Sequence, residues 1–403
     1  MSARPTGPTP TRARLSLVLL LYFLGVIAVI TLAPFRFIRP REIRLLASGD
    51  WFDVIANVLL FVPLGFLYPL TRATDDEPSL LEAAILGALL SVSIETIQIF
   101  EPARVSSLLD VLANTAGALA GALLVRASAR RIRVNAKLVG RLSLEIPLIG
   151  LIYLLVPLLV VASLSAEQQP LRMLAVLPLG LVGARLIGAV QRNHFGPSGL
   201  FDARGAASVG AGWMAMGTFP VWLRYPVAGI AMVGAVAAMA WFECSHAALL
   251  PHADRRFESE TLRRAAPFIV AYLLVATFLP LGDGIRHWRF EIGLTGARRD
   301  LGMQMVRLLE PVAAMTVLGY LLAEARGRRE LPFPRVVRRV AAECACIALA
   351  METSRGFQRG VGASGAQLAL VIAAGILGAA IYHHQREHVR WILAHRRETA
   401  KAA

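Results

Sequence analysis

The chain has 403 residues, of which 56% are hydrophobic and 17% are charged, and its mean hydropathy is +0.58. A water-soluble domain of this length needs more polar surface than so few charged residues can supply. Apolar runs recur from Leu15 to Tyr382, each about 20 residues long, which is the length of an α-helix that crosses a bilayer. We therefore predict an all-α, polytopic membrane protein with about 10–12 transmembrane helices.

The net charge of +15 does not indicate a nucleic-acid partner, because the basic residues stand in short clusters between the apolar runs. Flanks of this kind hold membrane helices in place and face anionic lipid. The three cysteines, Cys244, Cys344 and Cys346, fall within predicted helices and lack the spacing of a metal site. We interpret them as small packing residues, and we expect neither a metal nor another cofactor.

The apolar runs also set the predicted helix positions. These are 15–35, 53–71, 80–100, 107–125, 144–164, 173–191, 207–223, 226–244, 266–282, 303–323, 340–354 and 365–383. The first run is longer than the core of a signal peptide, so we interpret it as a retained helix. The stretch 207–223 is rich in glycine, and 340–354 is short and contains Glu343.

The distribution of Lys and Arg predicts which side of the membrane each helix end faces. With a cytoplasmic N-terminus, the cytoplasmic segments hold 27 of the 42 basic residues and the outer segments hold 13. We therefore predict that residues 1–14 and 384–403 are cytoplasmic tails. The first outer loop goes against this trend with four arginines, which either grip outer-leaflet head groups or form an anion-binding rim. They are Arg36, Arg39, Arg41 and Arg44.

Polar side chains are predicted to gather at one depth in the membrane. The second and fourth helices each open with Asp and Asn four residues apart, and the third ends with Glu and Gln three apart. Because these helices alternate in direction, the three ends meet near the outer interface. With an arginine in the turn, the candidate binding residues are Asp53, Asn57, Glu95, Gln98, Arg104, Asp110 and Asn114. Polar groups are costly in hydrocarbon, so their convergence indicates a binding site.

Two structural interpretations compete with a binding site. Asp53 and Asp110 stand in the first turns of their helices, where a carboxylate stabilises the positive end of the helix dipole. Glu95 and Arg104 could form a buried ion pair that fixes the packing.

Several motifs of this region carry a family resemblance. They are Asn57-Val-Leu-Leu-Phe-Val-Pro-Leu-Gly-Phe66, Ser93-Ile-Glu95-Thr-Ile-Gln98, and Arg104 with Leu109-Asp110-Val-Leu-Ala-Asn114 and Gly117. Together with Thr31-Leu-Ala-Pro34-Phe35, they resemble the VanZ-like family over about residues 15–126. The resemblance implies a four-helix domain of a bacterial membrane, with the seven candidate residues at family motif positions. The family is named after a protein associated with low-level resistance to teicoplanin.

The C-terminal part is similar to a degenerate second copy of this domain, at about residues 266–383. Residues 277–280 are similar to 31–34, and 317–320 to 63–66. Residues 352–381 align with 95–124 without gaps, with seven identities in thirty. In that register Glu95 corresponds to Glu352, but most other site positions differ. We therefore expect the first copy to hold the site and the second to be mainly structural, with a middle membrane segment at 144–244 between them.

The leading functional hypothesis is non-enzymatic. The protein would bind or handle an anionic lipid or a lipid-linked glycan at the outer leaflet of the bacterial inner membrane. A second hypothesis is an intramembrane hydrolase or transferase that uses Asp53, Glu95 and Asp110 as acid, base or cation ligands. A third is a transporter, because parallel repeats fit that architecture. Other polar positions, such as Arg307 with Glu310, are interpreted as local pairs, and the sequence names no protein partner.

Overall fold

The computed structural model shows a chain that is mostly α-helical. The residues it describes are 10–32, 45–46, 51–72, 79–100, 106–134, 136–195, 202–246, 256–278, 287–292, 301–327, 332–358 and 362–402. They form two compact units, one made of residues 1–140 and 386–403 and the other of residues 141–385.

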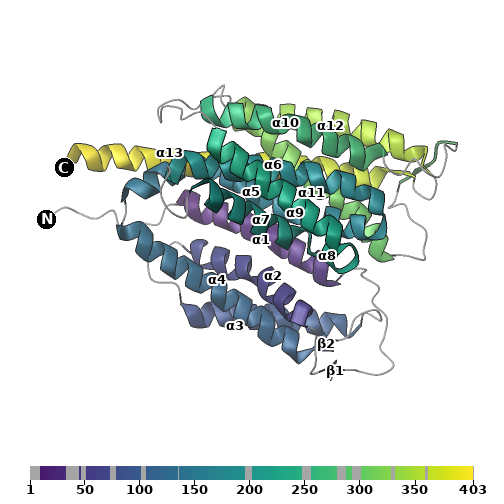
Figure 1. The fold of residues 1–403 in the computed structure, drawn as a ribbon, viewed down its shortest axis with the longest axis horizontal. Helices are drawn as coiled ribbons and strands as arrows, with labels where there is room; N and C mark the ends of the chain where they lie inside the picture. Colours follow the sequence, from purple (N-terminus) through teal and green to yellow (C-terminus); the bar gives the residue numbers. More distant parts are fainter. Residues whose placement is uncertain are drawn as a thin grey trace. The chain divides into compact units, whose positions relative to one another are not determined.

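The first unit is built around four helices that follow one another in the sequence. They are α1 (Pro10–Leu32), α2 (Trp51–Leu70), α3 (Leu80–Gln98) and α4 (Leu108–Val134). Helices α2 and α3 pack on α4, and α1 packs on α2 and α3 (Figure 1). Strand β1 (Leu45–Leu46) pairs in parallel with β2 (Ser106–Ser107), which leads directly into α4. This pairing joins the chain just before α2 to the chain just before α4.

The second unit contains a middle group of helices and then four helices that repeat the order of the first unit. The middle group is α5 (Ala136–Gln168), the short 3-10 helix η1 (Pro170–Arg172), α6 (Met173–Phe195), α7 (Ala203–Gly217), α8 (Phe219–Arg224) and α9 (Pro226–His246). The last four are α10 (Arg256–Phe278), α11 (Leu301–Gly327), α12 (Phe333–Gly356) and α13 (Gly365–Ala402), which belongs to this unit as far as Gln385. Strand β3 (Phe290–Glu291) pairs in parallel with β4 (Ala363–Ser364), and β4 leads directly into α13.

Each predicted helix is present among the described residues, but several ends differ. Helices α4, α12 and α13 extend well beyond the predicted limits into stretches rich in arginine, and α5 extends beyond its predicted limits at both ends. The apolar pattern stops there, whereas the helix does not, because Arg is a good helix former. The predicted helix 207–223 is divided into α7 and α8 at Thr218. Pro220 lies in the first turn of α8 and has no N–H to continue the hydrogen bonds of α7.

The described helices confirm the predicted class of protein. Nine of them are long and apolar enough to cross a membrane, in α2, α3, α4, α5, α6, α9, α10, α11 and α13. A further apolar stretch, Ala13–Ala28 in α1, is shorter. The chain is therefore an all-α, polytopic membrane protein.

Helices α2 and α4 approach each other so closely that only glycine fits between them. A Cβ atom at Gly121 would overlap the carbonyl oxygen of Val62, and one at Gly65 would overlap that of Ala118. In lipid, where apolar surfaces gain nothing by leaving water, close backbone packing of this kind holds helices together.

The same close approach occurs between α11 and α13 in the second unit. A Cβ atom at Gly378 would overlap the carbonyl oxygen of Thr316, and one at Gly319 would overlap that of Gly375. These glycines align with Gly121 and Gly65 in the register in which 352–381 matches 95–124 and 317–320 matches 63–66. We call this close contact between the second and fourth helices the glycine seam. It is formed at Gly65 and Gly121 in the first unit and at Gly319 and Gly378 in the second, so it is the same in both units.

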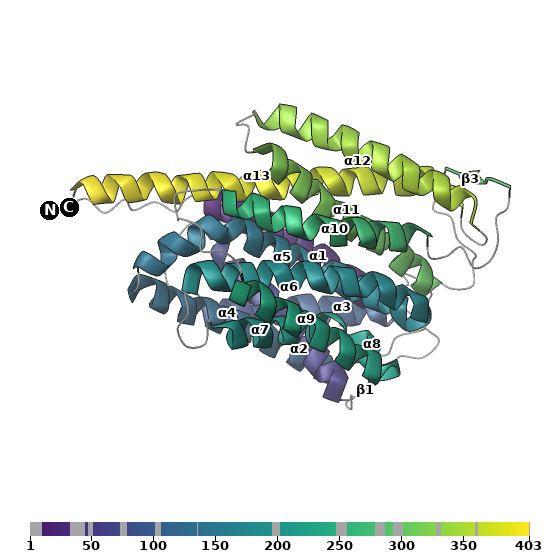
Figure 2. The same cartoon turned by 45° about the horizontal axis from the view of Figure 1, so that its top comes forward.

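Where the third helix packs on the fourth, the glycine lies on the third helix in the first unit and on the fourth helix in the second unit. In the first unit, a Cβ atom at Gly87 on α3 would be 2.6 Å from the Cβ of Ala118 on α4. In the second unit, the glycine is Gly375 on α13, and it faces Cys344 on α12, which runs beside α13 (Figure 2). One small residue is enough for close packing, and which helix supplies it does not matter.

We predict that Gly121→Ala and Gly378→Ala each lower the thermal unfolding midpoint of the detergent-purified protein. The added methyl group must push the two backbones apart, at a cost of about 1–3 kcal/mol. Gly25→Ala and Gly234→Ala are matched controls, because a Cβ atom there meets nothing within 4 Å. In these controls, the helix propensity of alanine should leave the midpoint unchanged or raise it. Equal midpoints for all four variants would show that the seam is not tightly packed.

Candidate functional site

The carboxylate of Glu95 ties the end of α3 to the start of α4. Its Oε2 accepts a hydrogen bond from the backbone N–H of Ser107 at 2.8 Å, and its backbone oxygen accepts one from the Ser106 hydroxyl at 2.8 Å. The hydroxyl oxygen of Ser107 accepts the N–H of Leu109 at 3.2 Å, in the first turn of α4. Donors at the start of a helix have no partner within it, and here side chains supply their acceptors.

Gln98 ties α3 to the end of α1. Its Nε2 donates to the carbonyl oxygen of Thr31 at 2.7 Å, and both residues are buried. Thr31 lies in the last turn of α1, where carbonyl groups lack a partner within the helix. Gln98 therefore satisfies a polar group that would be costly in hydrocarbon.

Both connections recur in the second unit. Oε2 of Glu352 accepts the backbone N–H of Ser364 at 3.0 Å, at the start of α13. Nε2 of Gln358 donates to the carbonyl oxygen of Thr277 at 3.0 Å, at the end of α10. The sequence alignment pairs Gln98 with Arg355, so the glutamine has moved by three positions while keeping its contact.

The recurrence assigns a structural role to two of the seven candidate residues. Glu95 and Gln98 make contacts that the second unit also makes, although it lacks most of the remaining polar side chains. The sequence could not distinguish these two from the others, because all seven are polar residues predicted to lie at the same depth.

Asn114 and Ser91 form a buried pair that the second unit does not have. Nδ2 of Asn114 donates to the Ser91 hydroxyl at 2.8 Å, and Oδ1 of Asn114 is buried without a hydrogen-bond partner. The aligned residues of the second unit are Ala348 and Val371, which are also buried. Because the same packing forms with an apolar pair, the fold does not require Ser91 and Asn114. A buried oxygen without a donor costs about 1–3 kcal/mol, so this amide is not there for stability.

The remaining acidic and amide residues lie at the same end of the first unit. Asp53 on α2 is exposed, and Asn57 on α2 and Asp110 on α4 are half-buried. A Cβ atom at Gly117 would overlap the carbonyl oxygen of Val58, so the first turns of α2 and α4 lie at the same level. Arg104 and the arginines of the first loop lie outside the described residues, and so does any pair between Glu95 and Arg104.

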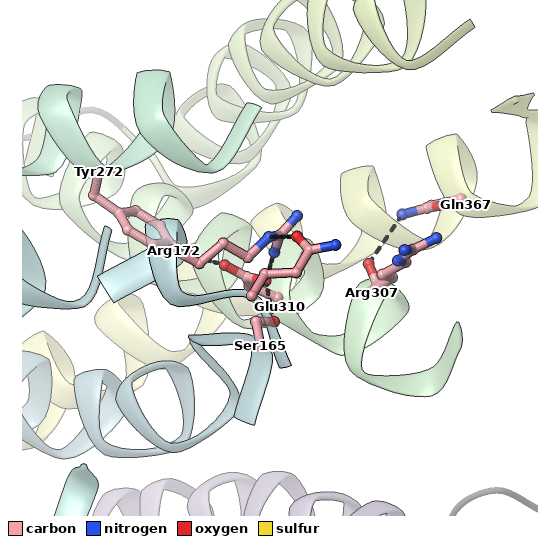
Figure 3. A network of polar contacts seen from close by, with 7 residues as sticks. Ser165, Arg172, Tyr272, Arg307, Glu310 and Gln367 are labelled. Atoms are coloured by element: carbon pink, nitrogen blue, oxygen red, sulfur yellow. Dashed lines mark hydrogen bonds and ion pairs between the residues drawn. The ribbon is translucent and has the colours of Figure 1, made fainter. Parts of the chain in front are cut away.

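A second polar cluster, centred on Glu310 of α11, was not predicted from the sequence. Glu310 is buried and accepts hydrogen bonds from the Ser165 hydroxyl at 2.7 Å, from Nη1 of Arg172 at 2.7 Å and from the Tyr272 hydroxyl at 3.3 Å. Figure 3 shows these three side chains converging on the carboxylate from α5, η1 and α10. Its one sequence signal is an acid within an apolar run, which from the sequence alone is interpreted as part of a local pair with Arg307.

Another buried acid, Glu243 on α9, connects three helices of the second unit. Its carboxylate pairs with Arg185 of α6 at 3.1 Å and with Arg264 of α10 at 3.2 Å. A buried pair of this kind fixes the arrangement of the helices. Within the described part of the chain, no group of three or more His, Cys, Asp or Glu side chains could hold a metal ion.

The fold and these buried polar contacts define a multi-pass α-helical membrane protein. Residues 9–132, which include α1 to α4 as far as Ile132, match the model of the VanZ/LLP1 family. This match confirms the resemblance that the motifs of the N-terminal part predicted. No curated protein and no solved structure matches the chain.

We predict that the recurring and the non-recurring contacts respond differently to substitution. Glu95→Ala and Glu352→Ala should each lower the unfolding midpoint of the purified protein, because a buried backbone N–H loses its acceptor at a cost of about 1–3 kcal/mol. The double variant Ser91→Ala/Asn114→Val copies the second unit and should unfold at the wild-type midpoint or above it. A large loss of stability in the double variant would mean that this pair, too, holds the fold together.

Proposed function

We propose that the protein binds the head group of a cell-envelope lipid, such as a lipid-linked glycan or an anionic lipid, at the polar end of α2, α3 and α4. We further propose that both termini are cytoplasmic, so that this end faces the outer leaflet of the inner membrane. In this proposal the protein holds or presents the lipid and does not change it chemically.

The observation that carries the proposal is the comparison between the two units. Asp53, Asp110, Ser91 and Asn114 are replaced in the second unit, while the seam and the connections between helices are kept. Since the same packing forms without these polar side chains, packing does not account for them. Polar residues that membrane segments do not need for packing mark functional sites.

The chemistry of these residues suits hydroxyl-rich ligands. Carboxylates and the free amide oxygen of Asn114 accept hydrogen bonds, which sugar hydroxyls can donate. The exposed carboxylate of Asp53 and the half-buried carboxylate of Asp110 are reached at one end of the helices, where a head group moving along the membrane surface would arrive. In this proposal the arginines of the first loop supply donors for a phosphate.

The repeated architecture favours a transporter as the second candidate. Parallel repeats related by an axis along the membrane normal are known among transporters, although their substrate sites usually lie near the midplane. The enzyme hypothesis has less support, because an oxygen of the Glu95 carboxylate is already engaged by a backbone N–H. Uptake of a labelled sugar phosphate into vesicles that contain the protein would favour transport over lipid binding.

We predict that Asp53→Asn/Asp110→Asn weakens binding of a polyprenyl-diphosphate-linked disaccharide to the protein in nanodiscs. Each lost charge-assisted hydrogen bond should weaken binding about tenfold, which native mass spectrometry can measure. Glu82→Gln is the matched control, because Glu82 lies at the opposite end of α3 and pairs with Arg72. Equal binding by the wild type and the double variant would exclude this site.

The orientation can be tested on one helix of a chain whose three native cysteines are replaced by alanine. Trp51 and Arg72 lie at opposite ends of α2, and both are exposed. We expect a membrane-impermeant maleimide added to intact cells to label Trp51→Cys and not Arg72→Cys. The reverse pattern would place the polar end in the cytoplasm, and the ligand would then be a cytoplasmic-leaflet lipid.

A further inference from the structure

Residues 287–292, which include β3 and lie between α10 and α11 in the sequence, expose three large apolar side chains. Trp288 is 49% exposed, Phe290 is 52% exposed and Ile292 is 84% exposed. The residues that alternate with them are polar and also exposed, and they are His287, Arg289 and Glu291. Because successive side chains of a strand point to opposite faces, this segment has an apolar face and a polar face.

Backbone hydrogen bonds hold the segment against the ends of two helices. The N–H of Arg289 donates to the carbonyl oxygen of Gly356, the last residue of α12, at 3.0 Å. The N–H of Ala363 donates to the carbonyl oxygen of Arg289 at 3.0 Å, and that of Ala366 donates to the carbonyl oxygen of Ile292 at 2.9 Å. Figure 2 shows β3 beside the end of α12. The segment therefore has a fixed position between the end of α12 and the start of α13.

The two aromatic rings of the apolar face rest on glycines at these helix ends. The indole of Trp288 lies over Gly356, and the ring of Phe290 lies beside Gly365, the first residue of α13. The two rings are nearly parallel, and their centroids are 5.9 Å apart. Since each side chain is about half exposed, one part packs on the helix ends while the other part faces away from the protein.

The pairing of β3 with β4 places the apolar face at the level where a membrane span begins. Phe290 lies opposite Ala363, and Glu291 lies opposite Ser364. The apolar span of α13, Gly365–Trp391, starts at the next residue. The segment therefore lies at the edge of the hydrocarbon layer, where tryptophan is enriched in membrane proteins.

The first unit has apolar residues at the corresponding positions. The pairing of β1 with β2 has the register of β3 with β4, so Leu45 corresponds to Phe290 and Ile43 corresponds to Trp288. The pairing of two strands uses backbone groups and does not account for apolar side chains at these positions. Their recurrence in both units points instead to apolar surroundings at this level.

We infer that the apolar face of residues 287–292 binds the surface of the bilayer, with Trp288, Phe290 and Ile292 inserted among the lipid chains next to the head groups. An exposed strand with an apolar face is a liability in water, and lipid covers it. Lipid is the occupant because the face adjoins the start of a membrane span. The polar face then meets head groups and water.

This anchor would also set the depth of the contact between α12 and α13. Ser364, whose N–H the carboxylate of Glu352 accepts, belongs to β4 and lies opposite Glu291 of the inserted strand. The inference does not depend on the function proposed for the first unit, nor on which leaflet this end of the second unit faces.

The test compares nitroxide spin labels on two neighbouring residues, in the full-length protein with its three native cysteines replaced by alanine and reconstituted into phosphatidylcholine vesicles. The measurement is the rate of collision with oxygen, which concentrates in the bilayer, and with a water-soluble nickel complex. We expect a label at Ile292→Cys to collide mainly with oxygen, and a label at Glu291→Cys to collide mainly with the nickel complex. Leu89→Cys, exposed in the middle of α3, gives the reference for a label deep in hydrocarbon.

A second pair of variants tests whether the aromatic side chains are the anchor. Trp288→Ser/Phe290→Ser should remove the excess of oxygen collisions at the Ile292→Cys label, whereas His287→Ser, on the polar face, should leave it unchanged. The inference is overturned if the label at Ile292→Cys meets the nickel complex as often as the label at Glu291→Cys does. It is also overturned if that label is immobilised and meets neither reagent, because protein would then cover the face, or if the double variant behaves like the parent.

Discussion

The hydrogen bond from a backbone N–H to a buried glutamate is the contact on which the rest of each unit depends. Glu95 accepts from Ser107 in the first unit, and Glu352 accepts from Ser364 in the second. A helix that starts at the edge of the bilayer leaves N–H groups that hydrocarbon cannot satisfy. The glutamate supplies the acceptor and thereby fixes the end of the third helix against the start of the fourth. We call this contact the joint. Because it fixes where the fourth helix starts, it also determines which residues of that helix meet the second helix at the glycine seam.

Comparison of the two units separates residues that form the fold from residues that do something else. Both units keep the glutamate, the capping serine, a glutamine that donates to the end of the first helix, and glycines in the seam. Replacing both members of a buried hydrogen-bonded pair with apolar residues can be nearly neutral, and Ala348 with Val371 is such a replacement of Ser91 with Asn114. The polar residues that remain unexplained in each unit are then the ones to examine for binding.

Much of the fold could be predicted from the sequence, because the bilayer demands long apolar helices and these are visible as runs of apolar residues. The grouping of polar side chains at one end of α2, α3 and α4 followed from alternating helix direction. The division of the candidate site could not be predicted, since a glutamate that holds a backbone N–H looks the same in sequence as one that binds a ligand. Long-range contacts such as that of Arg172 with Glu310 could not be predicted either, because no local sequence spacing joins the two residues. The break at Thr218 is marked in the sequence by Pro220, but a prediction based on apolar runs alone takes no account of proline.

The seam and the joints explain how the polar ends of the two units can carry different side chains on the same packing. Residues that hold the helices together lie between α2, α3 and α4, or between α11, α12 and α13, and they tolerate little change because the backbones nearly touch. The first turn of α2 lies beyond the seam, so the aligned residues Asp53 and Arg307 can differ while the packing at Gly121 and Gly378 stays the same. A buried charge in a medium of low dielectric must be stabilised, and the second unit pairs Arg172 with Glu310 and Arg355 with Glu352. Of these two acids, Glu352 also forms the joint, because it accepts the backbone N–H of Ser364 and pairs with Arg355.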